Sequence, residues 1–379
     1  MISTNDWPVT GRRRDGPADP RPGDRLGGCE PMRPARGTVA GFARGGRVSM
    51  RVAVVGAGRM AAVRTQALAD VEGVEICGVA SRRPERARRF AARFDVGFSS
   101  GRYQELMATA PDAVLVEAPH RVQDDVVRWA LENGLHVLVG GCLAADLPAA
   151  REVRRLAAER RLVVEAGYEA RYKEVWRRAA ALVGEGAVGE VLCIQSTALV
   201  DQDPASWYYD QAGSGGMFVT HLSYAFLNPL RWLFGMPLTV AAVSNRKVHT
   251  HPGAVEHETC VATLTFAGDV LCTATAGYVK PAALSAWSVR ILGSAGSLDM
   301  MPGDDDPGHL LHFPRQGAPR PHTFENNTAF HEQARAFVGA VRGQETVSNP
   351  PEDAILDLHL CELIADSAAR GGTPLRARP

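Results

Sequence analysis

The feature that most constrains the fold of this chain lies at residues 50–61, where a short β-branched run is followed by two glycines. Its sequence is MRVAVVGAGRMA, in which the run up to Val55 is followed by Gly56, Gly58 and Ala61 in a G-x-G-x-x-A pattern. Between a strand and a helix, this pattern is typical of a dinucleotide-binding turn. The first glycine permits the sharp turn, the second lets a pyrophosphate approach the backbone, and the small third residue lets the helix pack closely on the sheet.

The residues after the turn favour the same interpretation over a glycine turn with no ligand. A helix beginning near Arg59 would direct unpaired N–H groups and its positive dipole end toward the phosphates. We therefore expect Gly56, Gly58, Arg59 and Met60 to contact the cofactor. A second β-branched run, Val74–Val79, supports a strand-helix-strand unit. The apolar residues at helical spacing between the two strands are Met60, Val63, Ala67 and Leu68.

The pattern along the chain predicts two domains after an extension. Strands and helices alternate over residues 50–168, which favours a parallel α/β sheet. Over residues 169–379, long alternating stretches follow one another without helices between them, which favours an open, mostly antiparallel sheet. Residues 303–325 are rich in Pro, Gly and Asp and are predicted to form a loop, and a C-terminal helix is expected to pack back on the first domain. The predicted fold class is α/β: a Rossmann dinucleotide-binding domain followed by an α+β substrate and dimerisation domain.

Residues 1–49 are rich in Arg, Pro and Gly and show no apolar periodicity. Such a segment cannot bury enough surface to offset the entropy of ordering it, so we expect disorder there. The simplest interpretation is that translation begins at or close to Met50 and that the extension is a mis-assigned start.

Composition excludes several classes of partner. The chain carries 42 basic and 42 acidic side chains, so its formal net charge is zero and nothing favours nucleic acid or a charged membrane surface. No apolar run is long enough to cross a bilayer. The seven cysteines are scattered singly, without a C-x-x-C pair, which predicts a reducing cytoplasm and neither a disulfide framework nor a zinc knuckle.

Several local motifs from Met50 to about Leu375 resemble the glucose-fructose oxidoreductase / inositol dehydrogenase (Gfo/Idh/MocA) family. The resemblance implies a Rossmann domain coupled to an open antiparallel sheet and an NAD(P)-dependent oxidoreductase activity. It also implies that Pro119 and His120 lie beside the ribose and nicotinamide, and that Arg171 and Tyr172 line the active-site cleft. The motifs are G-A-G-R-M-A at Gly56, A-S-R-R-P-E-R-A at Ala80, D-A-V-L-V-E-A-P-H-R at Asp112, H-V-L-V at His136, E-A-R-Y at Glu169, G-A-V-G-E-V at Gly186, W-Y-Y-D at Trp207 before S-G-G-M at Ser214, and I-L-G-S-A-G-S-L at Ile291.

Two signatures of that family differ here. The family usually has Glu-Lys-Pro directly after the strand at His136–Val139, where this chain has Gly140-Gly141-Cys142. A glycine offers no side chain to donate to a substrate hydroxyl, and a cysteine lacks the fixed backbone angle of proline. The family's His-x-x-Asp signature is also absent. Its placement is ambiguous by one residue, with Tyr224 or Ala225 at the histidine position and Leu227 or Asn228 at the aspartate position.

Hydride transfer to or from an alcohol carbon also needs a group that moves the hydroxyl proton. His221 is one candidate, provided that its position in the helix brings the ring to the nicotinamide, and Tyr224 is the other. Each has a purely structural alternative as a ring packed in the domain interior. Cys142 lies at the expected cofactor crevice, but without a neighbouring base it is more readily explained as an inert buried cysteine. His249, His251 and His257 lack a convincing ligand set, and we predict no metal site.

The end of the second strand bears on the choice of cofactor. A carboxylate there would bind the ribose hydroxyls of NAD, whereas this chain has Ser81, Arg82 and Arg83. Hydroxyl and guanidinium groups suit the 2′-phosphate of NADP, so we expect NADP, with NAD as the alternative. The competing interpretation is that Ser81 only caps the next helix and that the arginines are solvated.

We therefore predict an NAD(P)-dependent oxidoreductase with a remodelled active site. It would act on a hydroxyl or carbonyl group of a small sugar-like or secondary-metabolite substrate. The alternative is a non-redox enzyme or a dinucleotide- or ligand-binding protein that has lost hydride transfer, because fold alone does not establish chemistry. A sheet with one uncovered face tends to acquire a partner, so we also expect a homo-oligomer formed through that face.

Overall fold

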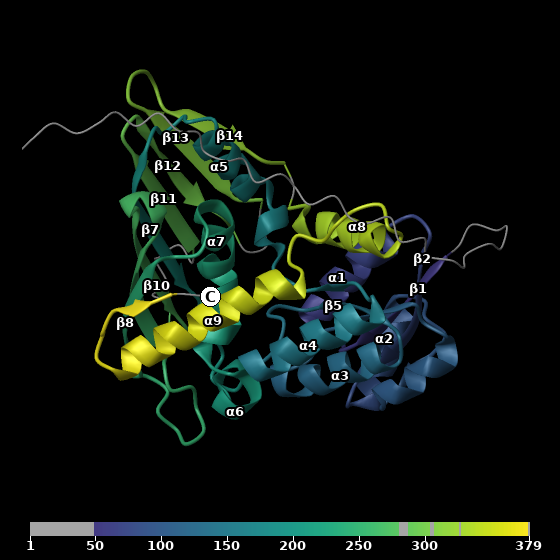
Figure 1. The fold of residues 1–379 in the computed structure, drawn as a ribbon. Helices are drawn as coiled ribbons and strands as arrows, with labels where there is room; N and C mark the ends of the chain where they lie inside the picture. Colours follow the sequence, from purple (N-terminus) through teal and green to yellow (C-terminus); the bar gives the residue numbers. More distant parts are fainter. Residues whose placement is uncertain (1–48, 280–286, 304–306, 326, 378–379) are drawn as a thin grey trace, which may run out of the picture. The chain divides into compact units, whose positions relative to one another are not determined.

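The computed structural model describes residues 49–279, 287–303, 307–325 and 327–377 (Figure 1). The predicted disorder of residues 1–49 falls almost entirely outside these residues. The first half of the described chain forms a six-stranded sheet in the order β3-β2-β1-β4-β5-β6, with every neighbouring pair parallel. Its strands are β1 Met50–Val55, β2 Val74–Ala80, β3 Ser99–Ser100, β4 Ala113–Val116, β5 His136–Val139 and β6 Val164–Glu165.

Helices connect these strands and cover both faces of the sheet. Each begins where the sequence provides a start: α3 follows Pro119, and α4 follows Asp146, whose side chain accepts a hydrogen bond of 2.8 Å from the Ala149 N–H. The strand order is that of a dinucleotide-binding Rossmann sheet, as predicted. The connecting elements are α1 Arg59–Ala69, α2 Pro84–Arg93, the 3₁₀ helix η1 Tyr103–Thr109, α3 His120–Glu132 and α4 Leu147–Arg160.

The second half forms a nine-stranded sheet in the order β14-β13-β12-β11-β7-β10-β9-β8-β15. Among the described strands, β7 and β10 are the parallel pair and the remaining neighbours are antiparallel. The prediction of an open, mostly antiparallel second sheet is therefore confirmed. Its strands are β7 Val191–Leu199, β8 Thr239–Asn245, β9 Thr259–Thr265, β10 Leu271–Gly277, β11 Trp287–Gly293, β12 Gly296–Met301, β13 His309–Pro314, β14 Arg320–Thr323 and β15 Leu375–Arg376.

The predicted loop at residues 303–325 was wrong, because it contains strands β13 and β14. Leu310 and His312 point into the protein, while His309 and Phe313 on the same strand are exposed, so the run alternates as a strand should. The Pro and Gly residues mark the turns around two strands at the sheet edge. Pro321 is tolerated because β14 is the edge strand, where a missing N–H leaves no ladder bond unmade.

Helices α8 and α9 tie the two halves together (Figure 1). Phe337 and Val338 of α8 belong to the core cluster formed by α1 and one face of the parallel sheet. Helix α9 contributes Leu358 to the cluster on the other face of that sheet and Leu360 to the core of the second half. The remaining elements are η2 Glu169–Tyr172, α5 Glu174–Gly184, η3 Trp207–Tyr209, α6 Gln211–Ser214, the π-helix η4 Phe218–Leu227, α7 Asn228–Phe234, η5 Ala267–Asp269, α8 Ala329–Val341 and α9 Pro351–Ala369.

None of the helices in the described part of the chain combines the length and the hydrophobicity that a lipid bilayer requires.

Candidate functional site

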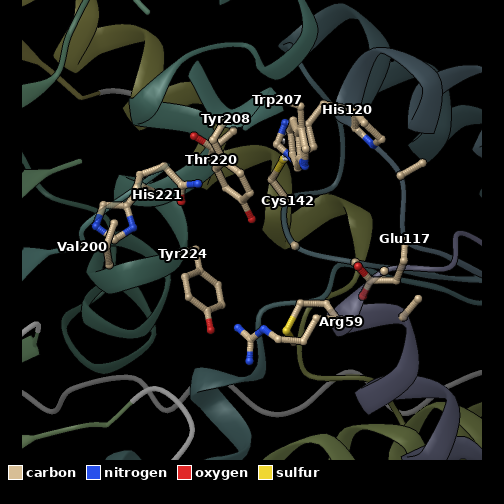
Figure 2. Close-up of a pocket in the computed structure, with 18 of the residues that line it drawn as sticks. Arg59, Glu117, His120, Cys142, Val200, Trp207, Tyr208, Thr220, His221 and Tyr224 are labelled. Atoms are coloured by element: carbon tan, nitrogen blue, oxygen red, sulfur yellow. Dashed lines mark hydrogen bonds between the residues drawn. The ribbon is translucent and has the colours of Figure 1, made fainter. Parts of the chain in front are cut away.

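A pocket of about 580 Å³ lies at the carboxyl edge of the parallel sheet, where ligands of open α/β sheets bind. One side comes from the turn after β1 and from the ends of β4 and β5. The other side comes from residues 200–208 and from the π-helix η4 (Figure 2). Of the predicted site residues, the pocket brings together Gly58, Arg59, Met60, Pro119, His120, His221 and Tyr224.

The glycine turn after β1 has the geometry that a pyrophosphate needs. Gly56 has φ +123°, and a Cβ at this position would lie 2.1 Å from the carbonyl oxygen of Glu117, so only glycine fits. A Cβ on Gly58 would meet nothing within 4 Å, so the backbone there is open to a ligand. Helix α1 has no side-chain cap and no acidic residue in its first turn. No capping side chain of the described chain therefore competes with an anion at this end of the helix, which fits the phosphates of a dinucleotide.

The residues after β2 keep the properties expected of a phosphate contact. The N-cap residue of α2 is Arg83, so the interpretation that Ser81 only caps this helix is wrong. Arg82 and Arg83 are exposed and form no ion pair with any residue that the structure describes. Two unpaired guanidinium groups at the edge of β2 are a suitable site for an anion.

The Glu117 side chain occupies the space beside Gly140, the residue that follows β5. A Cβ on Gly140 would lie 2.2 Å from the Glu117 side-chain carboxyl carbon. Arg64 Nε approaches Glu117 Oε1 at 2.7 Å, as an ion contact without hydrogen-bond alignment. Burial raises the pKa of Glu117, and Arg64 opposes that rise. The carboxylate and the cation of this corner thus come from β4 and α1, which explains why position 140 is a glycine.

Tyr224 and Glu169 form a hydrogen-bonded pair at the pocket. The Tyr224 hydroxyl donates to Glu169 Oε1, and Tyr224 lines the pocket while Glu169 is buried beside it. Arg64 lies 3.6 Å from Glu169 Oε2, and the buried Lys173 ammonium lies 4.0 Å from Oε1. Two cationic side chains therefore flank the carboxylate that accepts the Tyr224 hydrogen bond. Sequence reasoning missed Glu169, Arg64 and Lys173 as site residues, because their contacts join α1, η2 and η4.

His221 is in the pocket wall but its ring is engaged elsewhere. Its Nε2 lies 3.0 Å from the Ala198 carbonyl oxygen, to which it can only donate. Burial lowers the pKa of His221 from 6.5 to about 4. In Figure 2 the ring lies beside Val200, and the Tyr224 hydroxyl points away from it. The structure thus places Tyr224 better than His221 to exchange a proton with a ligand.

The buried neutral ring of His221 predicts a pH-dependent stability. Its folded pKa lies below the unfolded value, so the unfolded chain binds more protons between pH 6.5 and 4 and stability falls as the pH falls through that window. At 1.36 kcal/mol per pH unit, the contribution lost by pH 4 is about 3 kcal/mol. In urea unfolding, we expect the difference in free energy of unfolding between the wild type and His221→Asn to shrink by about this amount as the pH is lowered to 4. A difference that does not change between pH 7 and pH 4.5 would contradict the prediction.

Family models decide the relationship of the chain to known proteins. The model for the NAD-binding Rossmann domain of the GFO/IDH/MocA oxidoreductases matches residues 50–168, and the model for the GFO/IDH/MocA C-terminal domain matches residues 176–299. The chain belongs to the Gfo/Idh/MocA oxidoreductase family. It is therefore an NAD(P)-binding oxidoreductase with the two-part fold of that family.

Relatives of this Gfo/Idh/MocA protein include sugar and cyclitol enzymes. Myo-inositol dehydrogenase Hyg17 of Streptomyces leeuwenhoekii is 27% identical over 331 residues, which cover 86% of this chain and 98% of that protein. A dTDP-3,4-didehydro-2,6-dideoxy-alpha-D-glucose 3-reductase of Actinomadura kijaniata is 30% identical over 168 residues, 44% of this chain and 51% of that one. Levoglucosan dehydrogenase, solved with NADH and levoglucosan, shares the fold with a TM-score of 0.78 at 18% identity, covering 87% of this chain and 100% of that one.

The region of the second signature folds as the π-helix η4 in this family member. A π-helical turn accommodates one more residue than an α-helical turn, and such turns are frequent at functional sites. Tyr224 lines the pocket, whereas Ala225 is buried in the core. Asn228 begins α7 and is buried, and the Arg171 Nε–H donates to its Oδ1 at 3.0 Å. Tyr224 and Asn228 are four residues apart, whereas the His-x-x-Asp signature spaces its two residues three apart, so no single placement of the signature includes both.

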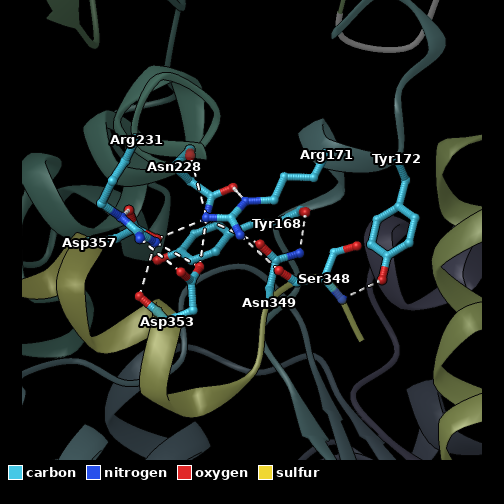
Figure 3. Close-up of polar contacts among 9 residues, drawn as sticks. All are labelled: Tyr168, Arg171, Tyr172, Asn228, Arg231, Ser348, Asn349, Asp353 and Asp357. Carbon is cyan, nitrogen blue, oxygen red and sulfur yellow. Dashed lines mark hydrogen bonds and ion pairs between the residues drawn. The ribbon is translucent and has the colours of Figure 1, made fainter. Parts of the chain in front are cut away.

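Arg171 and Tyr172, which the resemblance placed in the cleft, do not line the pocket. Arg171 is 5% exposed, so its side chain also does not lie on a solvated helix face, which is the common position of an arginine. Its guanidinium lies 2.7 Å from Asp353 in a buried network that joins η2, α7 and α9 (Figure 3). Tyr172 donates to Glu165 at 2.6 Å and accepts from the Ser348 N–H at 3.0 Å. Both side chains hold the helices around the site and do not reach into it.

The histidines weighed as metal ligands have other partners. His249 Nδ1 lies 2.7 Å from Glu258 Oε1, and His257 Nδ1 lies 2.7 Å from the Ser244 hydroxyl. Within the described residues, no three or more His, Cys, Asp or Glu side chains are grouped to hold a metal. All six cysteines that the structure describes are free.

Proposed function

We propose that this protein transfers hydride between a nicotinamide and a hydroxyl or carbonyl carbon of a sugar-like or secondary-metabolite substrate. The hydrogen-bonded Tyr224–Glu169 pair in the cofactor pocket carries the proposal, because it supplies a path for the hydroxyl proton. The relatives named for inositol and deoxysugar chemistry support this substrate class. If the chain had lost hydride transfer, side chains could have filled the space where the substrate binds. The pocket beside Tyr224 is open, which gives no support to that alternative.

The hydrogen bond between Tyr224 and Glu169 gives a path for proton transfer in both directions of the reaction. As an alcohol is oxidised, the Tyr224 oxygen accepts the substrate proton while the phenol proton passes to Glu169 Oε1. Arg64 and Lys173 lie beside this carboxylate, and reduction of a carbonyl runs the same path in reverse. The nicotinamide, when bound, supplies or accepts the hydride. The Tyr224–Glu169 pair would thus transfer the proton that the histidine and aspartate transfer in other members of the family. The active site would be remodelled by Glu117 and Gly140.

NADP is the cofactor we favour over NAD. The support is electrostatic: Ser81, Arg82 and Arg83 directly follow β2, where a carboxylate would bind the ribose of NAD, and the two arginines are exposed and form no ion pair with the described residues. We expect Arg82→Ala to weaken NADPH binding about tenfold or more in a fluorescence titration and to leave NADH binding almost unchanged. Arg93→Ala, a change in the last turn of α2, is the matched control. Equal weakening for both nucleotides would contradict the preference, and no binding of either would contradict the proposed function.

The outer face of the nine-stranded sheet is the surface we propose for a homo-oligomer. Within the described chain, Val243, Val261 and Leu271 are exposed on that face, with exposed fractions of 53%, 44% and 57%. Threonines flank them, so the face is both apolar and β-branched. Sedimentation should show a dimer or larger species that Val261→Lys disrupts, and a wild-type monomer would contradict this.

The free cysteines fit the cytoplasm as the compartment, which localisation of a tagged chain would test.

A further inference from the structure

Glu117 lies at the point of the parallel sheet where the strand order reverses. The chain adds β2 and β3 on one side of β1 and then β4, β5 and β6 on its other side. Ligands of open α/β sheets bind outside the carboxyl ends of the strands at such a point. Glu117 is the first residue after β4, and it lines the pocket together with Gly58 of the turn after β1. Figure 2 shows its side chain directed into the pocket, so a dinucleotide bound there has to pass it.

Glycines on both neighbouring strands leave room for Glu117. A Cβ on Gly56, which follows β1, would lie 2.1 Å from the Glu117 carbonyl oxygen, and a Cβ on Gly140, which follows β5, would lie 2.2 Å from its carboxyl carbon. Gly56 also has a positive φ, whereas Gly140 does not. Any residue could therefore adopt the backbone conformation of Gly140, and the space taken by the Glu117 carboxylate is what requires a glycine there.

The Glu117 carboxylate has acceptor capacity that the described chain does not use. Within the described residues, neither of its oxygens receives an aligned hydrogen bond, and Arg64 Nε contacts the buried Oε1 at 2.7 Å as an ion. The other nitrogens of Arg64 donate to Gln333 Oε1 and, at 2.6 Å, to the Gly167 carbonyl oxygen. A carboxylate offers about four acceptor positions, and a largely buried one is costly without donors. The 14% of the side chain that stays exposed is thus suited to a ligand that donates hydrogen bonds.

The order of the strands indicates which part of a dinucleotide reaches Glu117. The arginines after β2 suit the 2′-phosphate of the adenosine, and the glycine turn after β1 suits the pyrophosphate. Because β4 lies on the other side of β1, the nicotinamide nucleoside follows at its end. A carboxylate repels phosphate groups but accepts hydrogen bonds from ribose hydroxyls.

We propose that Glu117 accepts hydrogen bonds from the hydroxyls of the nicotinamide ribose, and that position 140 is a glycine because any side chain there would displace the carboxylate. The proposal rests on the dinucleotide binding of the proposed function and not on the proton path through Tyr224. NAD and NADP both carry this ribose, so Glu117 holds either cofactor, whereas Arg82 distinguishes between them.

Equilibrium binding of four nucleotides to the full chain tests the proposal. NADPH and NADH carry the nicotinamide ribose, ADP-ribose carries the corresponding ribose without the nicotinamide, and 2′,5′-ADP ends before that ribose. Fluorescence titration measures the first two and calorimetry the other two. The variants are Glu117→Ala, Glu117→Gln, Gly140→Ala and the double change Glu117→Ala with Gly140→Ala. Glu132→Ala, which removes an exposed carboxylate of α3 that does not line the pocket, is the matched control.

Glu117→Ala should weaken the binding of NADPH, NADH and ADP-ribose about tenfold or more, the usual contribution of a hydrogen bond to a charged group. Binding of 2′,5′-ADP should stay within about twofold of the wild type, which also shows that the variant is folded. Glu117→Gln keeps one acceptor oxygen and should have a smaller effect. Gly140→Ala should weaken the same three nucleotides, and the double variant should bind them no more weakly than Glu117→Ala, because both changes remove the same contact. Glu132→Ala should bind all four nucleotides as the wild type does.

Four results would overturn the proposal. Equal weakening of all four nucleotides by Glu117→Ala would show that Glu117 serves only to pair with Arg64. Weakened NADH with unchanged ADP-ribose would place the contact on the nicotinamide ring and not on the ribose. Wild-type binding of NADPH and NADH by Glu117→Ala would remove the contact while the proposed function stands. A wild type that binds neither NADPH nor NADH would overturn the proposed function as well.

Discussion

Replacing Tyr224 by phenylalanine is expected to lower kcat by about 10²- to 10⁴-fold, the usual contribution of a positioned acid or base. The change removes one oxygen and leaves the ring packed 5.7 Å from the ring of Trp287. NADPH binding should stay within about twofold of the wild type, because the glycine turn and the β2 edge are untouched. Steady-state kinetics on a hydroxyl or carbonyl substrate and a fluorescence titration with NADPH measure the two effects separately.

Two further variants make the Tyr224 prediction specific. His221→Asn should keep most of the activity, since the His221 ring is bonded to the Ala198 carbonyl and does not serve the substrate. Glu169→Gln should lower kcat and alter its pH profile, because an amide cannot receive the phenol proton. Tyr103→Phe, a change at a half-buried tyrosine that packs on Trp129, is the control. Activity that survives in Tyr224→Phe and disappears in His221→Asn would reverse the assignment.

Replacing Asp357 by alanine is expected to destabilise the protein by about 3–5 kcal/mol. Asp357 is completely buried on α9. Arg231 Nε donates to its Oδ1 at 2.8 Å and the Asn228 amide donates to its Oδ2 at 2.8 Å (Figure 3). Removing the carboxylate leaves a buried guanidinium short of one partner and leaves the Asn228 amide with Asn349 Oδ1 at 3.2 Å as its remaining acceptor. Urea unfolding at pH 7 gives the loss directly.

The Asp357 prediction has internal controls. Arg231 also pairs with Asp353 at 2.8 Å, so the loss should be smaller than for an arginine left with no carboxylate. The double change Arg231→Met with Asp357→Leu should recover much of the stability, because an apolar pair removes both buried charges. Asp366→Asn, which alters an exposed pair with Arg370 at 3.8 Å, should have no measurable effect. A loss in Asp357→Ala no larger than that of Asp366→Asn would show that the buried network adds no stability.

Local patterns predicted much of the fold because they act within a few residues. The glycine turn after β1, the start of α4 behind Asp146 and the alternating strands of the second half all follow from spacing and backbone freedom. The segment at 303–325 was missed because two short edge strands surrounded by Pro and Gly look like a loop. The π-helical hydrogen bonding of η4 was not predicted, because the local sequence indicates only a helix.

The sequence by itself determined the fold class, the family, the cofactor turn and a short set of candidate residues. Tertiary structure decided among those candidates. It turned His221 toward a backbone carbonyl and directed Tyr224 to Glu169. The physical reason is range: glycine freedom and hydrophobic periodicity are properties of adjacent residues, whereas the role of an ionisable side chain depends on partners and burial that only packing of distant segments provides.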